Sequence, residues 1–187
     1  MRKVTYSLGV SLDGYIASTD GSIDWSDPGD DLHQFHIERT RRVGTSLYGR
    51  RLYENMAAYW PTADEDPEAS DFIVEFARLW RAIPRVVFST TLTEVGHNSR
   101  LVRGNVVEEV NALKAQSGGE IEVGGAGLGA SLIRLGLIDE YAVWVFPVIL
   151  GGGTPFFPTL DKRIELRLLE TQEFSGGIVY SHYSAEV

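Results

Sequence analysis

Hydrophobic and polar positions along the chain follow two alternating periods. Short apolar runs typical of buried strands occupy residues 3–10, 45–49, 85–90 and 120–125. The stretches between them carry apolar residues every three or four positions, which is the period of an amphipathic helix. These predicted helices cover residues 31–42, 50–60, 72–83, 106–116 and 128–136. Alternating strands and helices predict parallel strands joined by crossover helices.

The pattern changes after residue 138. Three strand-like segments follow, at 139–150, 164–174 and 177–187, without a convincing helix between them. Consecutive strands without crossover helices pair antiparallel. The sequence therefore predicts one α/β domain over residues 1–187, a three-layer sandwich. Its central sheet is mixed and mostly parallel, with antiparallel C-terminal strands and helices on both faces.

Composition narrows the function classes. The 187 residues suit one domain with one core, and the net charge of −9 repels a phosphate backbone, so no nucleic-acid partner is expected. The absence of cysteine excludes disulfides, thiolate metal sites and cysteine nucleophiles. The four histidines form no ligand cluster in sequence, so no metal is expected. The longest apolar run, 141–150, is about half a membrane span, and a cytoplasmic protein without a membrane partner is expected.

A long loop follows the first predicted strand, at residues 11–35. Connections of this length inside a compact domain are either disordered or functional. The loop holds Tyr15, Ile16, Ile23 and Trp25, which is too much apolar surface for a solvated linker. We therefore expect it to fold over a ligand.

Three further strand ends carry residues suited to phosphate. Gly49 precedes Arg50 and Arg51 at a helix start, where free N–H groups and guanidinium groups attract anions, although a solvated helix start is the alternative. Ser89 and Thr90 follow a buried strand, where their hydroxyls would bind phosphate or cap a turn.

The third of these strand ends carries a glycine cluster. Gly124, Gly125 and Gly127 stand between a strand and a helix, and they serve either a close diphosphate contact or tight helix–strand packing. Their spacing is neither G-x-G-x-x-G nor that of a P-loop. A second glycine run, 151–153, predicts a turn or bulge that brings Phe156 and Phe157 against the sheet.

Five segments, in this order, resemble the dihydrofolate reductase superfamily. They are "SLDGYIA", "GRRLYE", "VVFST", "VGGAGL" followed by "LGLIDE", and "PVILGGG". The resemblance is greater to the branch that contains the reductase domain of the riboflavin-pathway bifunctional deaminase–reductase. It implies a dihydrofolate-reductase-like fold, NADPH as cofactor, and hydride transfer to a small heterocyclic substrate that is pterin-like or pyrimidine-ribose-like.

The resemblance also implies roles for individual residues. Ile16 and Ala17 would meet the nicotinamide, and Ser89 and Thr90 the adenosine phosphate. Phosphate contacts at the helix start and the diphosphate turn would come from Gly49, Arg50, Arg51, Leu52, Gly124, Gly125, Ala126, Gly127 and Leu128. The implied substrate pocket contains Asp13, Tyr15, Trp25 and Phe35.

The resemblance makes Asp31 the candidate acid in the substrate pocket. Asp27 or Asp30 could take its position, and an ordinary carboxylate at a helix N-terminus is the other interpretation. Tyr15 replaces the lysine usual in the riboflavin-pathway domain, which indicates a different substrate pocket.

A nucleotide-binding or dimeric interaction protein without turnover is the alternative to an enzyme. Trp144, Phe146, Phe156 and Phe157 would form either a homodimer interface or core.

Overall fold

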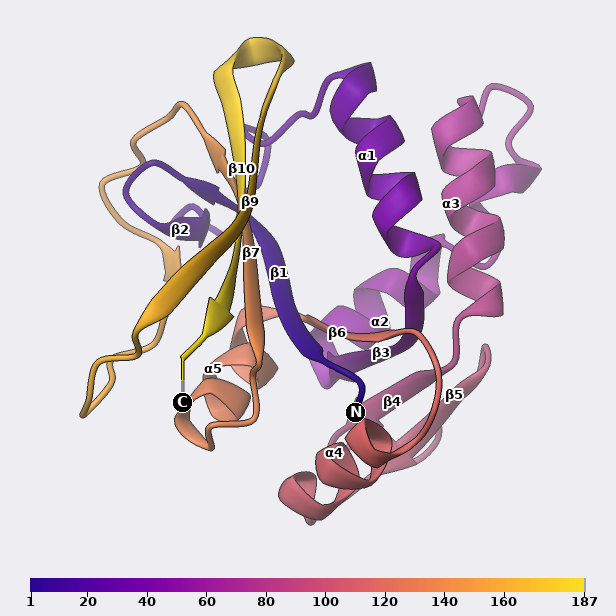
Figure 1. Cartoon of the computed structure of the whole chain (residues 1–187). Helices are drawn as coiled ribbons and strands as arrows, with labels where there is room; N and C mark the ends of the chain where they lie inside the picture. The colour runs from indigo at the N-terminus through magenta and orange to yellow at the C-terminus, as the bar shows by residue number, and fades with distance from the viewer. Residues whose placement is uncertain (187) are drawn as a thin grey trace.

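A computed structural model describes residues 1–186, which form a sheet of eight strands in the order β5-β4-β3-β6-β1-β7-β10-β9 (Figure 1). The strands are β1 (Val4–Ser11), β3 (Val43–Gly49), β4 (Arg85–Phe88), β5 (Ser99–Val102), β6 (Glu120–Gly124), β7 (Glu140–Phe146), β9 (Leu166–Phe174) and β10 (Ile178–Ala185). The first six in sheet order are parallel, and β10 is antiparallel to both of its neighbours. The predicted mixed α/β sheet is confirmed.

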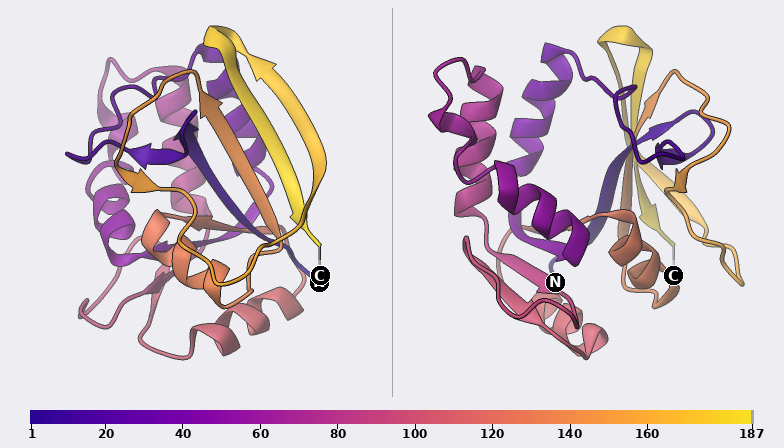
Figure 2. Two further views of the ribbon diagram at one scale, coloured as in Figure 1. Left: turned by 90° about the vertical axis from the view of Figure 1, so that its left-hand side faces the viewer. Right: turned by 180° about the vertical axis from the view of Figure 1, so that it is seen from behind.

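Helices cover both faces of the sheet (Figure 2). One face carries α1 (Asp30–Thr40), α2 (Arg50–Tyr59) and α3 (Asp71–Ala82). The other carries α4 (Val106–Ala115) and α5 (Ala126–Arg134). Two short 3-10 helices complete the set, η1 (Ala63–Glu65) before α3 and η2 (Ser175–Gly177) between β9 and β10.

The period of two along β1 divides the sheet into two chemically different faces. Val4 and Tyr6 are fully buried in the core beneath α4 and α5. Thr5 and Ser7 alternate with them and therefore face α1. Farther along that second face, Leu32 of α1 packs with Trp144 and other apolar side chains of the C-terminal strands.

A two-stranded ribbon lies outside the main sheet. It pairs β2 (Tyr15–Ala17) with β8 (Thr154–Pro155), and thus joins the opening loop to the second glycine run. Gly153 has a φ of +141°, and a Cβ there would overlap the carbonyl oxygen of Ala17. Only glycine can therefore occupy position 153.

Phe156 lies against the sheet as predicted, because it is buried and stacks on Tyr6 with ring centroids 4.4 Å apart. Phe157 remains 46% exposed. Trp144 and Phe146 are buried in the core of this single chain.

Candidate functional site

The carboxyl ends of three neighbouring parallel strands, β5, β4 and β3, border a cleft of about 350 Å³ together with the first residues of α5. The cleft is lined by Gly49, Phe88, Ser89, Thr90, Val102, Arg103, Gly104, Val106, Gly127, Leu128 and Ser131. Predicted cofactor residues from three separate segments thus meet in one place. In open α/β sheets this edge is where ligands bind.

Three helices point their N-termini at this cleft. Helix α2 begins directly after Gly49, α4 begins at Val106, and Gly127 lies in the first turn of α5. A helix N-terminus presents unpaired N–H groups and the positive end of the helix dipole. Among the described residues, the lining includes one cationic side chain, Arg103, and no carboxylate. The cleft is therefore suited to an anion, although the chain as a whole carries a charge of −9.

The turn between β6 and α5 is built from glycine for two reasons. Gly125 has a φ of +86°, in the left-handed region. A Cβ on Gly124 would overlap the end of the Leu52 side chain and lie 3.2 Å from Cε1 of Tyr48. The turn is thus in direct contact with α2. At Gly127 an added Cβ would meet nothing within 4 Å, so backbone is accessible there.

The two arginines of the α2 start lie outside the lining of the cleft. Arg50 forms an ion pair of 3.1 Å with Glu54, one turn along the helix, and both side chains are half-exposed. Arg51 is exposed. Their phosphate contacts stay predictions.

Ser89 serves the local backbone as well as lining the cleft. Its hydroxyl oxygen accepts hydrogen bonds from the backbone N–H groups of Thr91 and Leu92, at 3.2 and 3.1 Å. The hydroxyl of Ser89 thus caps a turn, which was the alternative to phosphate binding. The neighbouring Thr90 is exposed. A phosphate contact for either hydroxyl stays a prediction.

Arg103 was missed in the sequence because β5 was not predicted. Its Nη2 donates to the carbonyl of Thr93 at 3.1 Å, which holds the side chain at the end of β5. The signal available in the sequence was a short run ending in Arg-Gly just before the predicted helix at 106.

The opening loop is anchored to the segment that follows β7. The carboxylate of Asp13 accepts hydrogen bonds from the backbone N–H groups of Leu150 and Gly151 and from the Ser11 hydroxyl. These bonds lower the pKa of Asp13, the Ser11 bond most strongly. Ile16 packs against the core beneath α5, and neither it nor Ala17 lines the cleft.

The other predicted substrate residues are dispersed. Trp25 packs edge-on against Phe146 and, together with Asp27, lines a second hollow of about 290 Å³. Tyr15 lies in the ribbon, opposite Pro155. Phe35 instead packs α1 onto the sheet through Phe174 and Tyr180.

Asp31 joins α1 to η2. Its Oδ2 accepts hydrogen bonds from the backbone N–H and the hydroxyl of Ser175, both at 2.8 Å. These bonds hold the pKa of Asp31 below its usual range, so the group is ionised at neutral pH. An ionised carboxylate accepts hydrogen bonds but has no proton to donate. The acid role stays a prediction, and Asp30 lines a separate groove between α1 and α3.

Residues 1–186 offer neither a cluster of metal ligands nor a helix able to span a membrane. They contain no group of three or more histidine, cysteine, aspartate or glutamate side chains able to hold a metal ion. Within the same range, every helix is too short or too polar to cross a membrane.

Comparisons with known proteins match nearly the whole chain. The model of the RibD C-terminal domain family matches residues 2–180. The uncharacterized protein YyaP of Bacillus subtilis is 35% identical over 185 residues, which cover 97% of this chain and 94% of YyaP.

Two solved structures extend the comparison to the fold. A protein of Shewanella sp. PV-4 assigned to riboflavin biosynthesis superposes with a TM-score of 0.78, 25% identity and full coverage of both chains. Dihydrofolate reductase of Enterococcus faecalis, solved with NADP(H) and RAB-propyl, superposes with a TM-score of 0.65 and 16% identity over 99% of this chain and 97% of that enzyme. The dihydrofolate-reductase-like fold is thereby confirmed.

Proposed function

Because this chain belongs to the RibD C-terminal domain family, we propose that it is an NADPH-dependent reductase. The observation that carries this proposal is the convergence of three helix N-termini and Arg103 on one cleft. The proposed reaction is hydride transfer to a small heterocyclic molecule, pterin-like or pyrimidine-ribose-like. We expect the protein to act in the cytoplasm, without nucleic-acid or membrane partners; a homodimer also stays a prediction.

The lining residues fit a reduced dinucleotide. The accessible backbone at Gly127 would receive the diphosphate at the start of α5. Arg103, with the neighbouring Ser89 and Thr90, would bind the adenosine phosphate that distinguishes NADPH from NADH. Bound NADPH would supply the hydride, and the protein would supply position and exclude water.

The alternative is a nucleotide-binding protein without turnover. It is favoured by the hydrogen bonds that engage Asp31 and by the tyrosine at position 15. The hydrogen bonds would leave the cofactor cleft without an acid, and the tyrosine would remove substrate contacts of the related enzymes.

The test separates binding from turnover. NADPH fluorescence would first be titrated with protein, and NADPH oxidation would then be followed with dihydrofolate and with a panel of pterins and pyrimidinones. Binding followed by oxidation with one of these compounds is the expected result. Binding with no oxidation across the panel supports the alternative, and no binding overturns both.

A further inference from the structure

The apolar face of the sheet beneath α5 continues onto the C-terminal strands, where it loses its cover. Tyr6 of β1 is in register with Tyr141 of β7, and Tyr141 with Tyr183 of β10. Leu168 of β9 follows as the partner of Tyr183. Residues in register share one face of a sheet. Tyr6 and Tyr141 are buried, Tyr183 is half-buried and Leu168 is 51% exposed, so exposure increases along the row toward β9.

A second row follows the same course. The buried Val10 of β1 is in register with Val145 of β7, and Val145 with Val179 of β10. Val179 is 39% exposed although β10 has a neighbouring strand on each side. Its exposure therefore means that the described part of the chain leaves this face uncovered. The left panel of Figure 2 shows the reason, since no helix of residues 1–186 lies over β9 or β10 on the α5 side.

The uncovered surface, here named the outer face, is apolar and rich in hydroxyl groups. Ser181 and Thr171 lie between the two rows, in register with each other. Phe157 extends the surface beyond the strands, because its ring packs against Tyr141 with centroids 5.6 Å apart and remains exposed. The outer face thus consists of Phe157, Leu168, Thr171, Val179, Ser181 and Tyr183.

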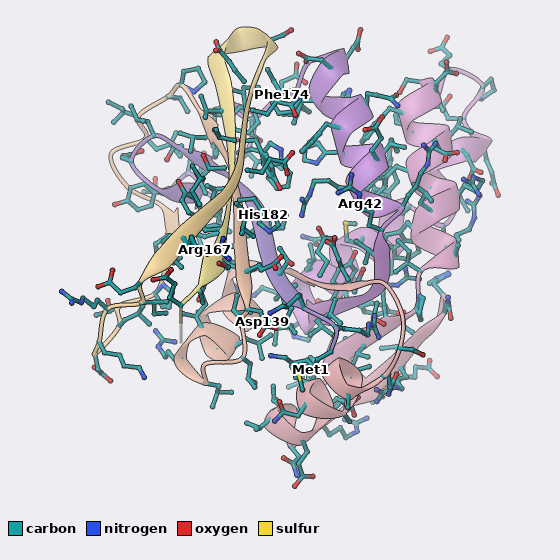
Figure 3. All side chains as sticks on the ribbon, viewed as in Figure 1. Met1, Arg42, Asp139, Arg167, Phe174 and His182 are labelled. Carbon is teal, nitrogen blue, oxygen red and sulfur yellow. The ribbon has the colours of Figure 1, made fainter. Side chains whose placement is uncertain are left out.

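The opposite face of the same strands already has a partner within the chain. His182 of β10 lies on the α1 side (Figure 3), where it pairs with Glu140 at 2.9 Å. Tyr180 and Phe174 also face that side, and both pack against Phe35 of α1. The outer face has no such helix within the described range.

Strand β9 adds a free edge to the outer face. Residues 166–173 of this strand are all exposed, and β10 is its one neighbour in the sheet that the structure describes. Natural proteins usually shorten or cover an edge strand, because its unpaired backbone groups attract other chains. A nine-residue edge beside uncovered apolar side chains is therefore typical of a surface that another chain covers.

The total surface of the chain agrees with a missing partner. Its accessible surface is 10168 Å². A folded monomer of 20.7 kDa is expected to expose about 8,900 Å². The excess of about 1,300 Å² is larger than the ~800 Å² that each partner buries in a standard protein–protein interface.

The charge pattern favours a second copy of this chain as the partner. Each chain carries a charge of −9, so two copies repel one another where their surfaces are acidic. The six residues of the outer face are uncharged, and Glu173 borders them at the η2 end, beside Val179. In a two-fold arrangement with antiparallel strands, the two Glu173 side chains lie at opposite ends of the interface. Hydroxyl groups both donate and accept hydrogen bonds, so this surface is able to pair with itself.

We propose that the outer face is a homodimer interface, in which β9 and β10 of one chain pack face to face against β9 and β10 of a second copy. Sheets packed in this way interdigitate their side chains, which would bury Leu168, Val179 and Phe157. The inference goes beyond the proposed function and does not depend on it. The outer face and the cofactor cleft lie at opposite ends of the strand order.

Sedimentation equilibrium of the full chain, from micromolar concentrations upward, measures the dissociation constant of the dimer. Val179→Lys and Leu168→Lys each place two like charges in the interface, one from each copy. We expect either substitution to raise the dissociation constant by about 100-fold or more. Val74→Lys is the matched control, because Val74 lies on α3 and is 43% exposed. Its dissociation constant should change by less than about threefold. The Tm of each variant checks that it is folded.

Cross-linking through a single introduced cysteine supplies the second measurement. The chain contains no cysteine, so a thiol-reactive cross-linker can join only two copies of a variant. Ser181→Cys, at the centre of the outer face, should give a covalent dimer. Ser117→Cys, exposed after α4, should stay monomeric.

Three results would overturn the proposal. The first is a wild-type chain that stays monomeric at every concentration, which would leave the outer face to a different protein. The second is a dimer that the two outer-face lysines weaken no more than Val74→Lys does. The third is equal cross-linking of Ser181→Cys and Ser117→Cys, which would place the contact between copies elsewhere.

Discussion

Leu52 of α2 packs directly over Gly124 at the end of β6, where a Cβ would overlap the leucine side chain. This contact joins two segments that are 72 positions apart in sequence (124 − 52) and that carry the N-termini of α2 and α5. The geometry of the cleft therefore depends on the absence of a side chain at position 124.

Gly124→Ala should lower stability by about 1–3 kcal/mol, because an added methyl group overpacks a close contact. It should also weaken NADPH binding, since α2 and α5 would be pushed apart. Thermal or urea unfolding of Gly124→Ala, Leu52→Ala and the double variant tests the contact. The stability loss of the double variant should differ by at least about 0.5 kcal/mol from the sum of the losses of the two single variants. Strict additivity would show that these residues do not interact.

Arg103→Ala should reduce affinity for NADPH by about 10- to 100-fold, the loss expected for one charge-assisted hydrogen bond. NADH lacks the adenosine phosphate, so its affinity should change by less than about threefold. Fluorescence titration of both cofactors gives the two Kd values. Arg100→Ala is the matched control, because Arg100 pairs with Glu109 and does not line the cleft. An equal loss for both cofactors would remove the assigned phosphate contact.

Asp31→Asn tests whether this carboxylate is structural or catalytic. The folded-state pKa of Asp31 is depressed, so its stabilising effect is present above its unfolded pKa and is lost as the pH falls through the folded pKa. The variant should therefore lower Tm at pH 7 and have a smaller effect at pH 3. As the general acid, Asp31 should contribute about 100-fold to turnover with the best substrate, whereas a loss of less than about threefold in Asp31→Asn would show that the carboxylate is structural only.

Glu122→Gln should have the opposite pH dependence. The folded-state pKa of Glu122 is raised, so its favourable contribution is present below its unfolded pKa and is lost as the pH rises through the folded pKa. Replacing it with a neutral amide should raise Tm at pH 8 more than at pH 5. Calorimetric scans at the two pH values measure this difference, and an equal change at both would mean that Glu122 titrates as it does in the unfolded chain.

Local pattern was sufficient for most of the sheet. The apolar runs at 85–90 and 120–125 correspond to β4 and β6, and the amphipathic segment 72–83 corresponds to α3. Strand β5 was missed because its four residues include the polar pair Ser99–Arg100, and parallel pairing with β4 forms it. The order of the three C-terminal strands was equally hidden in the sequence. The last strand, β10, lies between β7 and β9, so β7 and β9 are not paired although they follow each other in the chain.

The candidate site also contains features that the local sequence predicts and features that only tertiary contacts determine. Glycines and hydroxyls at strand ends are visible in the sequence, and the fold brings Gly49, Ser89 and Gly127 to one cleft. Whether a charged side chain faces a ligand or another residue depends on tertiary contacts. The Asp31–Ser175 bond spans 144 positions, and Thr5 and Glu122 lie in register on two strands that pattern alone assigns to an apolar core.

Thermal unfolding with NADPH tests the central claim, that the helix N-termini at the strand ends form a dinucleotide site. At a concentration 100 times Kd, a ligand bound only to the folded state adds about 2.7 kcal/mol of stability. For a chain of this size, that corresponds to a Tm increase of about 5–10 °C. We predict this increase with NADPH and a smaller one with NADH. A Tm that neither cofactor changes at millimolar concentration would contradict the claim.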